Sequence, residues 1–291
     1  MSQAPPAERA HARWAPHTGP AGPRQALLSG WTGLREALHA EWTKLRTLPG
    51  TPWLLGALIL LTVAVSTAAT AAATCPSGDC SVDPAKLSLT GINLGQAVAA
   101  ILGVLVISGE YSTGMIRTTI TAMPRRTSMM AAKAIIVTGL VLAAGTVAVL
   151  GSLLAGGLIL PGHGFTPAHG YPALSLGDGP VLRAAAGSVL YLGLIALLSL
   201  GIATIIRDSG AAIGTVLGLL YLSPVIAAAV TSPHWHNGIE RYAPMSAGLA
   251  IQATTGLRSL PISPWGGLGV LAAWAAAALL AGGLLLRLRD A

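Results

Sequence analysis

Charged residues are scarce in this sequence: Asp, Glu, Lys and Arg together make up 9% of the 291 residues. A soluble domain of this length needs about a quarter of its residues charged to cover its surface. Hydrophobic residues make up 53% instead. The composition therefore excludes an ordinary soluble domain and predicts a protein that lies in a lipid bilayer.

Motifs that carry enzymatic chemistry are also missing. The sequence contains no GxxxxGK[ST] phosphate loop, no HExxH, no GxSxG and no paired carboxylates within one loop. No acidic residue lies in the middle of an apolar run, although a proton-driven carrier usually needs such a group. We therefore expect no enzyme activity, no cofactor and no metal bound by this chain, and an ion-driven carrier is the weakest alternative.

Cysteine occurs only twice, as Cys75 and Cys80 in the segment CPSGDC. If this loop lies outside the cell, a disulfide between the two can persist, and we favour that interpretation. A metal pair would need further ligands, and the loop offers only Asp79 and Asp83.

Six apolar runs are each long enough, at about 20 residues, to cross the hydrocarbon core. Approximately, they are 53–73, 92–108, 134–160, 184–206, 211–230 and 265–286. Arg207 and Asp208 leave room only for a tight turn between the fourth and fifth runs, which predicts antiparallel neighbours. The sequence thus predicts an all-α integral membrane protein with six transmembrane helices.

The region before the first run divides into two parts. Residues 1–30 are rich in proline and are predicted to form a disordered tail, so that 31–291 is the transmembrane domain. Within 34–48, apolar residues recur at helical spacing and predict an amphipathic helix on the membrane surface. Glu41 falls inside the apolar stripe. Its carboxylate either points to water or pairs with Lys44, or it serves as a docking contact for a partner.

Basic residues in the short loops predict the orientation. If the N-terminus is cytoplasmic, the opposite side of the membrane carries only four basic residues: Lys86, Arg183, Arg241 and Arg258. No apolar signal core precedes Trp53. We therefore expect a cell-membrane protein with both termini in the cytoplasm. Because orientation accounts for the formal charge of +7, we expect no nucleic-acid partner.

Two further segments stand out. Gly210, Gly214 and Gly218 recur every fourth residue, a spacing that allows close helix packing either within one subunit or between subunits. The longest outer segment, 231–264, predicts a short helix after Pro244 that is re-entrant or lid-like.

Residues 109–133, GEYSTGMIRTTITAMPRRTSMMAAK, form the strongly charged interruption of the apolar sequence. After Glu110, the apolar residues fall on one side of a short helix with Arg117 on the other, which predicts a helix along the cytoplasmic membrane surface. Pro124 ends this helix, and Thr127 or Ser128 caps the next one, which carries Lys133.

This stretch resembles the signature between the second and third helices of ABC type-2 permeases. The similarity rests on residues 109–111, Gly114, residues 116–118, residues 124–126 and Lys133, and residues 40–47 are similar to the connecting helix of that family. The resemblance implies the permease subunit of an ATP-driven exporter, paired with a second permease subunit. A separate ABC ATPase subunit would hold ATP and Mg, and membrane lipid would surround the spans.

The resemblance also implies roles for particular residues. The ATPase contact, or coupling helix, would comprise Glu110, Tyr111, Gly114, Arg117, Pro124, Arg125 and Arg126. The connecting helix would comprise Glu41, Trp42, Lys44 and Arg46. Two alternatives stay open: topology alone accounts for the basic residues, and Glu110 either pairs with Arg117 or acts in coupling. A function of another class is a non-transporting membrane anchor or scaffold, and the substrate is indicated only as small or amphipathic.

Overall fold

The computed structural model of the protein describes residues 23–47, 50–75, 80, 82–112, 126–171 and 173–288. Within these residues it contains helices and no strand, which confirms the predicted all-α class. The α-helices are α1 (Pro23–Thr47), α2 (Gly50–Ala72), α3 (Pro84–Ser88), α4 (Ile92–Ser112), α6 (Arg126–Ile159), α7 (Gly179–Ile206), α8 (Ser209–Ala229), α9 (Pro233–Tyr242), α10 (Pro244–Leu249) and α11 (Pro264–Leu288). Short 3-10 helices are η1 (Leu160–His163), η2 (Pro167–His169), η3 (Ala250–Gln252) and η4 (Leu257–Ser259).

Six helices, α2, α4, α6, α7, α8 and α11, are long and apolar enough to cross a membrane. They coincide with the six predicted runs, so the multi-pass membrane architecture is confirmed. The largest difference is at α6, which begins at Arg126 rather than at residue 134. The helix starts earlier because no proline or glycine follows Pro124 in this stretch, so its polar first turns continue directly into the apolar part.

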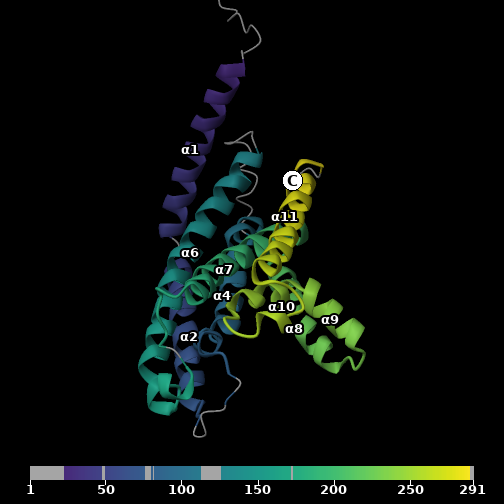
Figure 1. The fold of residues 1–291 in the computed structure, drawn as a ribbon. Helices are drawn as coiled ribbons and strands as arrows, with labels where there is room; N and C mark the ends of the chain where they lie inside the picture. The colour runs from purple at the N-terminus through teal and green to yellow at the C-terminus, as the bar shows by residue number, and fades with distance from the viewer. Residues whose placement is uncertain are drawn as a thin grey trace, which may run out of the picture.

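Helices α4 and α7 form the centre of the bundle, and α7 packs against α4, α6, α8 and α11 (Figure 1). Small residues allow these contacts. A Cβ atom at Gly103 of α4 would lie 2.5 Å from the Ala196 carbonyl oxygen of α7, and a Cβ atom at Gly201 of α7 would lie 2.6 Å from the Ala278 carbonyl carbon of α11. Such close backbone approach is how helices gain packing energy where lipid removes the hydrophobic effect between them.

The two ends of the bundle differ. Helix α1 and the end of α11 lie at one end, which we call the terminal end, and the loop from α2 to α3 lies at the other, which we call the disulfide end (Figure 1). There the structure joins Cys75 to Cys80 in a disulfide with a Cα–Cα distance of 6.0 Å. The Cys75 N–H donates to the His163 carbonyl of η1 at 2.9 Å, which fixes this loop to the end of α6.

The turn between α7 and α8 is as tight as predicted. Arg207 takes a left-handed conformation with φ 63°, and the Asp208 carboxylate accepts the Ala211 N–H at 2.7 Å as the N-cap of α8. Helices α7 and α8 pack against each other as neighbours.

The predicted short helix after Pro244 is α10, which lies among α7, α8, α9 and α11 (Figure 1). Ala247 and Ile251 are fully buried, and a Cβ atom at Gly248 would lie 2.5 Å from the ring of Tyr191. The segment α10–η3 is therefore part of the core and not a peripheral loop.

The predicted division into a disordered tail, 1–30, and a transmembrane domain stays a prediction; residues 1–22 lie outside the described residues, and helix α1 begins at Pro23. The physical reason is that proline is well tolerated at the first position of a helix, and no further proline interrupts the residues that follow up to Thr47.

Candidate functional site

Helix α1 turns one narrow face toward α6. Ala37, Glu41 and Leu45 are all buried, and their spacing of four residues places them on one side of the helix. Trp42, which the sequence places in the apolar stripe facing the membrane surface, is 48% exposed. The small Ala37 side chain and the paired Glu41 carboxylate, not the indole, face α6, and the predicted membrane contact of Trp42 stays a prediction.

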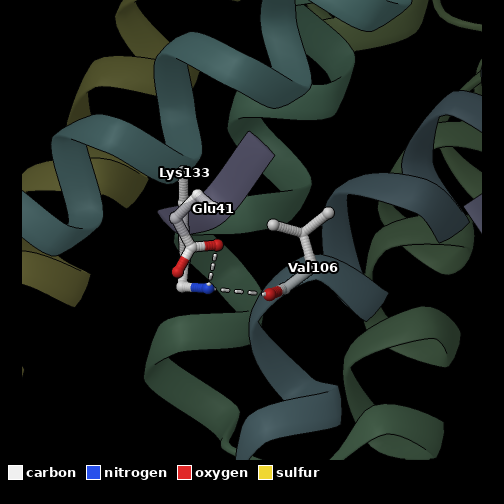
Figure 2. Close-up of polar contacts among 3 residues, drawn as sticks. All are labelled: Glu41, Val106 and Lys133. Carbon is white, nitrogen blue, oxygen red and sulfur yellow. Dashed lines mark hydrogen bonds and ion pairs between the residues drawn. The ribbon is translucent and has the colours of Figure 1, made fainter. Parts of the chain in front are cut away.

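The partner of Glu41 is Lys133 in the second turn of α6. Lys133 is fully buried, and its Nζ lies 2.8 Å from Glu41 Oε2. The same ammonium donates to the Val106 carbonyl of α4 at 3.3 Å. Figure 2 shows the lysine reaching from α6 between the carboxylate of α1 and the carbonyl of α4.

Charge pairing explains why these groups can be buried. An isolated ammonium or carboxylate in an apolar environment carries a large desolvation penalty, and a close partner with good geometry offsets it. An ammonium has three donors, which suits a contact that joins several elements. The expectation that Glu41 points to water or pairs with Lys44 is wrong, since its carboxylate is 5% exposed and bound to Lys133.

We call Glu41, Val106 and Lys133 the α1–α4–α6 junction. Helix α4 ends at Ser112 and α6 begins at Arg126, so the junction joins the two helices on either side of segment 113–125. It also attaches α1 to both.

Most of the predicted ATPase contact lies outside the described residues. This holds for Gly114, Arg117, Pro124 and Arg125. The backbones of Glu110 and Tyr111 lie in the last turn of α4, and that of Arg126 begins α6, while their side chains are outside the described part. The predicted roles of these residues stay predictions.

The predicted connecting helix is better defined. Of its four residues, Glu41 is buried in the junction, Lys44 is partly exposed, and Trp42 and Arg46 are exposed. On the exposed side of α1, a groove is lined by Arg35, Glu36, His39, Ala40, Thr43, Lys44 and Thr47. Helix α1 thus has a face fixed to the bundle and a polar face with both charges.

The three predicted packing glycines lie on α8. A Cβ atom at Gly214 or Gly218 would have no heavy atom within 4 Å, and one at Gly210 would meet only Asp208 Oδ1 at 3.5 Å. Within the part of the chain that the structure describes, no other helix covers this face of α8.

Asp83 connects two segments at the disulfide end. Its carboxylate accepts the Ala85 and Lys86 N–H groups at 3.1 Å as the N-cap of α3. It also accepts the Thr254 N–H at 2.5 Å, the Thr254 hydroxyl at 2.7 Å and the Thr255 N–H at 3.1 Å. Burial raises the pKa of this carboxyl, but the hydrogen bonds from Thr254, Lys86 and Thr255 lower it by more than burial raises it. The pKa therefore lies below its ordinary value.

Sequence reasoning named both Glu41 and Lys133 but did not join them. A signal was present: a carboxylate lies inside the apolar stripe of one helix, and a lysine lies within the first turns of an apolar span. Two opposite charges that each break an apolar pattern favour a mutual pair, because each alone would be costly to bury. Among the described residues, no three His, Cys, Asp or Glu side chains gather as a metal site.

No protein-family model matches the chain, and no curated protein matches it. The resemblance to ABC type-2 permeases therefore depends on the motif residues and on the plan of six apolar helices.

Proposed function

We propose that the chain is the transmembrane subunit of an ATP-driven ABC exporter in the cell membrane, with both termini in the cytoplasm. A separate ATPase subunit binds ATP and Mg and hydrolyses the nucleotide. Displacement of segment 113–125 by that partner moves α4 and α6, and the spans open a path for a small or amphipathic substrate.

The α1–α4–α6 junction carries this proposal. Segment 113–125 holds the motif that resembles the coupling helix, and the helices before and after it meet at Lys133. A buried ion pair resists shear, because separating the charges in an apolar environment is costly. The junction is therefore suited to transmit a displacement of the segment to α1 and to the two spans together.

Two surfaces are suited to partners. The groove on the exposed face of α1 carries Arg35, His39 and Lys44 beside Glu36, which suits a polar contact with an ATPase subunit. The uncovered Gly214 and Gly218 on α8 permit close approach of a helix from a second permease subunit.

Substitutions in segment 113–125 and at its edge test the coupling. Glu110→Ala and Arg117→Glu should leave insertion unchanged, because the apolar spans determine insertion. At equal membrane abundance, each should reduce ATP-dependent export at least tenfold, since reversing Arg117 places a negative charge against the ATPase. Arg258→Glu makes the same charge reversal on the exposed 3-10 helix η4 and should have no effect.

Export that stays at the wild-type level in both variants would refute the coupling role. A chain that co-purifies with a partner but supports no ATP-dependent flux would instead indicate a membrane anchor or scaffold.

The proposed orientation is tested separately: a cysteine label near Ser128 should react only from the cytoplasm.

A further inference from the structure

A cavity of about 290 Å³ lies between α3–α4 and α10–η3, toward the disulfide end of the bundle. Helices α8 and α9 also contribute to its wall, so its residues come from segments far apart in the chain. Its volume is at the low end for small-molecule sites, and at about 30 Å³ per water it equals roughly ten water molecules. It therefore fits a molecule of head-group size and not a drug-sized one.

Hydrogen bonds behind the lining residues Asn93 and Met245 hold one wall of the cavity. Gln96 Nε2 donates to the Asn93 carbonyl and to Met245 Sδ, each at 3.2 Å, and both acceptor residues line the cavity. The Tyr191 hydroxyl donates to Gln96 Oε1, and the Tyr221 hydroxyl donates to the Asn93 carbonyl. Gln96 and Tyr191 are fully buried, so the wall that Asn93 and Met245 form is held from behind by a shielded polar network.

The side of the cavity formed by η3 is fixed as well. Arg183 donates to the Ala253 carbonyl at 2.6 Å, and Gln252 donates to Ser188 Oγ at 3.3 Å. The next residue, Thr254, is bound to Asp83, whose carboxylate also caps the helix that carries Lys86. The α3–α4 side and the α10–η3 side of the cavity are thus held at a fixed separation before any ligand binds, which reduces the conformational entropy lost on binding.

The cavity contains one basic and one acidic side chain, from different elements. Among the described residues, Lys86 of α3 has no ion-pair partner. Glu240 of α9 has one, the His236 imidazole at 3.5 Å, which is charged only when protonated. A partly buried apolar wall that includes Leu249 and Ile262 lies beside them. Opposite charges in one small cavity match a ligand that itself carries both signs.

We propose that this cavity binds a small zwitterion, with Lys86 against its phosphate or carboxylate and Glu240 against its ammonium. The class includes free amino-alkyl phosphodiesters and the head group of a zwitterionic phospholipid. The site does not depend on the exporter proposal, because binding to the isolated full-length chain measures it without an ATPase.

The test uses two probes on the purified, delipidated chain in detergent. Calorimetry measures binding of free glycerophosphoethanolamine, and native mass spectrometry compares retention of phosphatidylethanolamine with that of phosphatidylglycerol. We expect one zwitterion per chain. Binding of the free probe alone identifies a solute site, and retention of phosphatidylethanolamine alone identifies a lipid site.

Lys86→Gln and Glu240→Gln should each weaken binding at least tenfold without changing the unfolding temperature, because both side chains are at least partly exposed. Arg258→Gln and Asp178→Asn make the same charge changes at exposed positions outside the cavity and should bind as wild type does. The proposal is overturned if neither probe binds, if phosphatidylglycerol is retained as well as phosphatidylethanolamine, or if the two cavity variants bind normally.

Discussion

Replacing Glu41 by glutamine removes a negative charge from the buried ammonium of Lys133 while keeping the shape of the side chain. Breaking one side of a buried ion pair costs about 3–5 kcal/mol, most of it the penalty for the charge left behind. We expect a loss near the lower limit, about 3 kcal/mol, since glutamine retains an acceptor oxygen and the ammonium retains the Val106 carbonyl.

The double variant Glu41→Gln/Lys133→Met removes both charges and should recover most of this loss. Replacing a buried pair by uncharged groups of similar size is often close to neutral. Lys133→Met alone leaves the Glu41 carboxylate buried without its cation and should cost as much as Glu41→Gln. The two single losses should therefore not add: if each single variant loses about 3 kcal/mol and the double variant about 1 kcal/mol, the coupling energy between the two sites is about 5 kcal/mol.

The assay is reversible unfolding in mixed micelles, with the free energy of unfolding compared across the four proteins of the cycle. Glu36→Gln makes the same chemical change at an exposed position of α1 and should stay within about 0.5 kcal/mol of wild type. If Glu41→Gln costs no more than Glu36→Gln, or if the double variant loses the sum of the single losses, the junction does not hold α1 on the bundle.

Two further predictions concern the disulfide end. Because the pKa of Asp83 lies below the ordinary 3.8, the stability it contributes is complete above the unfolded pKa and is lost as pH falls through the folded pKa. The protection factor of the Thr254 amide, its exchange rate corrected for the intrinsic pH dependence, should therefore fall below about pH 4 in wild type. Asp83→Asn should show low protection already at neutral pH, and equal, pH-independent protection factors in both proteins would exclude this role. Gly267→Ala should lower the unfolding temperature by several degrees, because the added Cβ would lie 1.9 Å from the Ala247 carbonyl oxygen. The control Gly269→Ala, whose Cβ would have no heavy atom within 4 Å, should leave the unfolding temperature unchanged. Equal effects of the two variants would argue against tight α10–α11 packing.

The spans could be predicted because their signal is local. A run of about 20 apolar residues has few other stable structures, and Arg207 with Asp208 marks the α7–α8 turn within the sequence itself. The start of α6 was less predictable, because hydropathy does not report where a helix begins before it enters the apolar region.

The junction and the cavity could not be predicted, since they depend on contacts between distant residues. Glu41 and Lys133 are 92 positions apart, and Gln96 meets Met245 across 149. Polar residues inside apolar spans, such as Gln96 and Tyr191, do not alter a hydropathy pattern enough to reveal their partners. Their pairing follows only from how α4, α7 and α10 pack.

The most direct measurement of the proposed function is the composition of the complex that the full-length chain forms in its native membrane. Mild solubilisation, affinity purification and quantitative mass spectrometry should yield a stoichiometric partner with a phosphate-loop ATPase domain, and the ATPase activity of that complex should fall at least tenfold in Arg117→Glu but not in Arg258→Glu. A chain that purifies alone, or with partners that bind no nucleotide, would contradict an ATP-driven exporter.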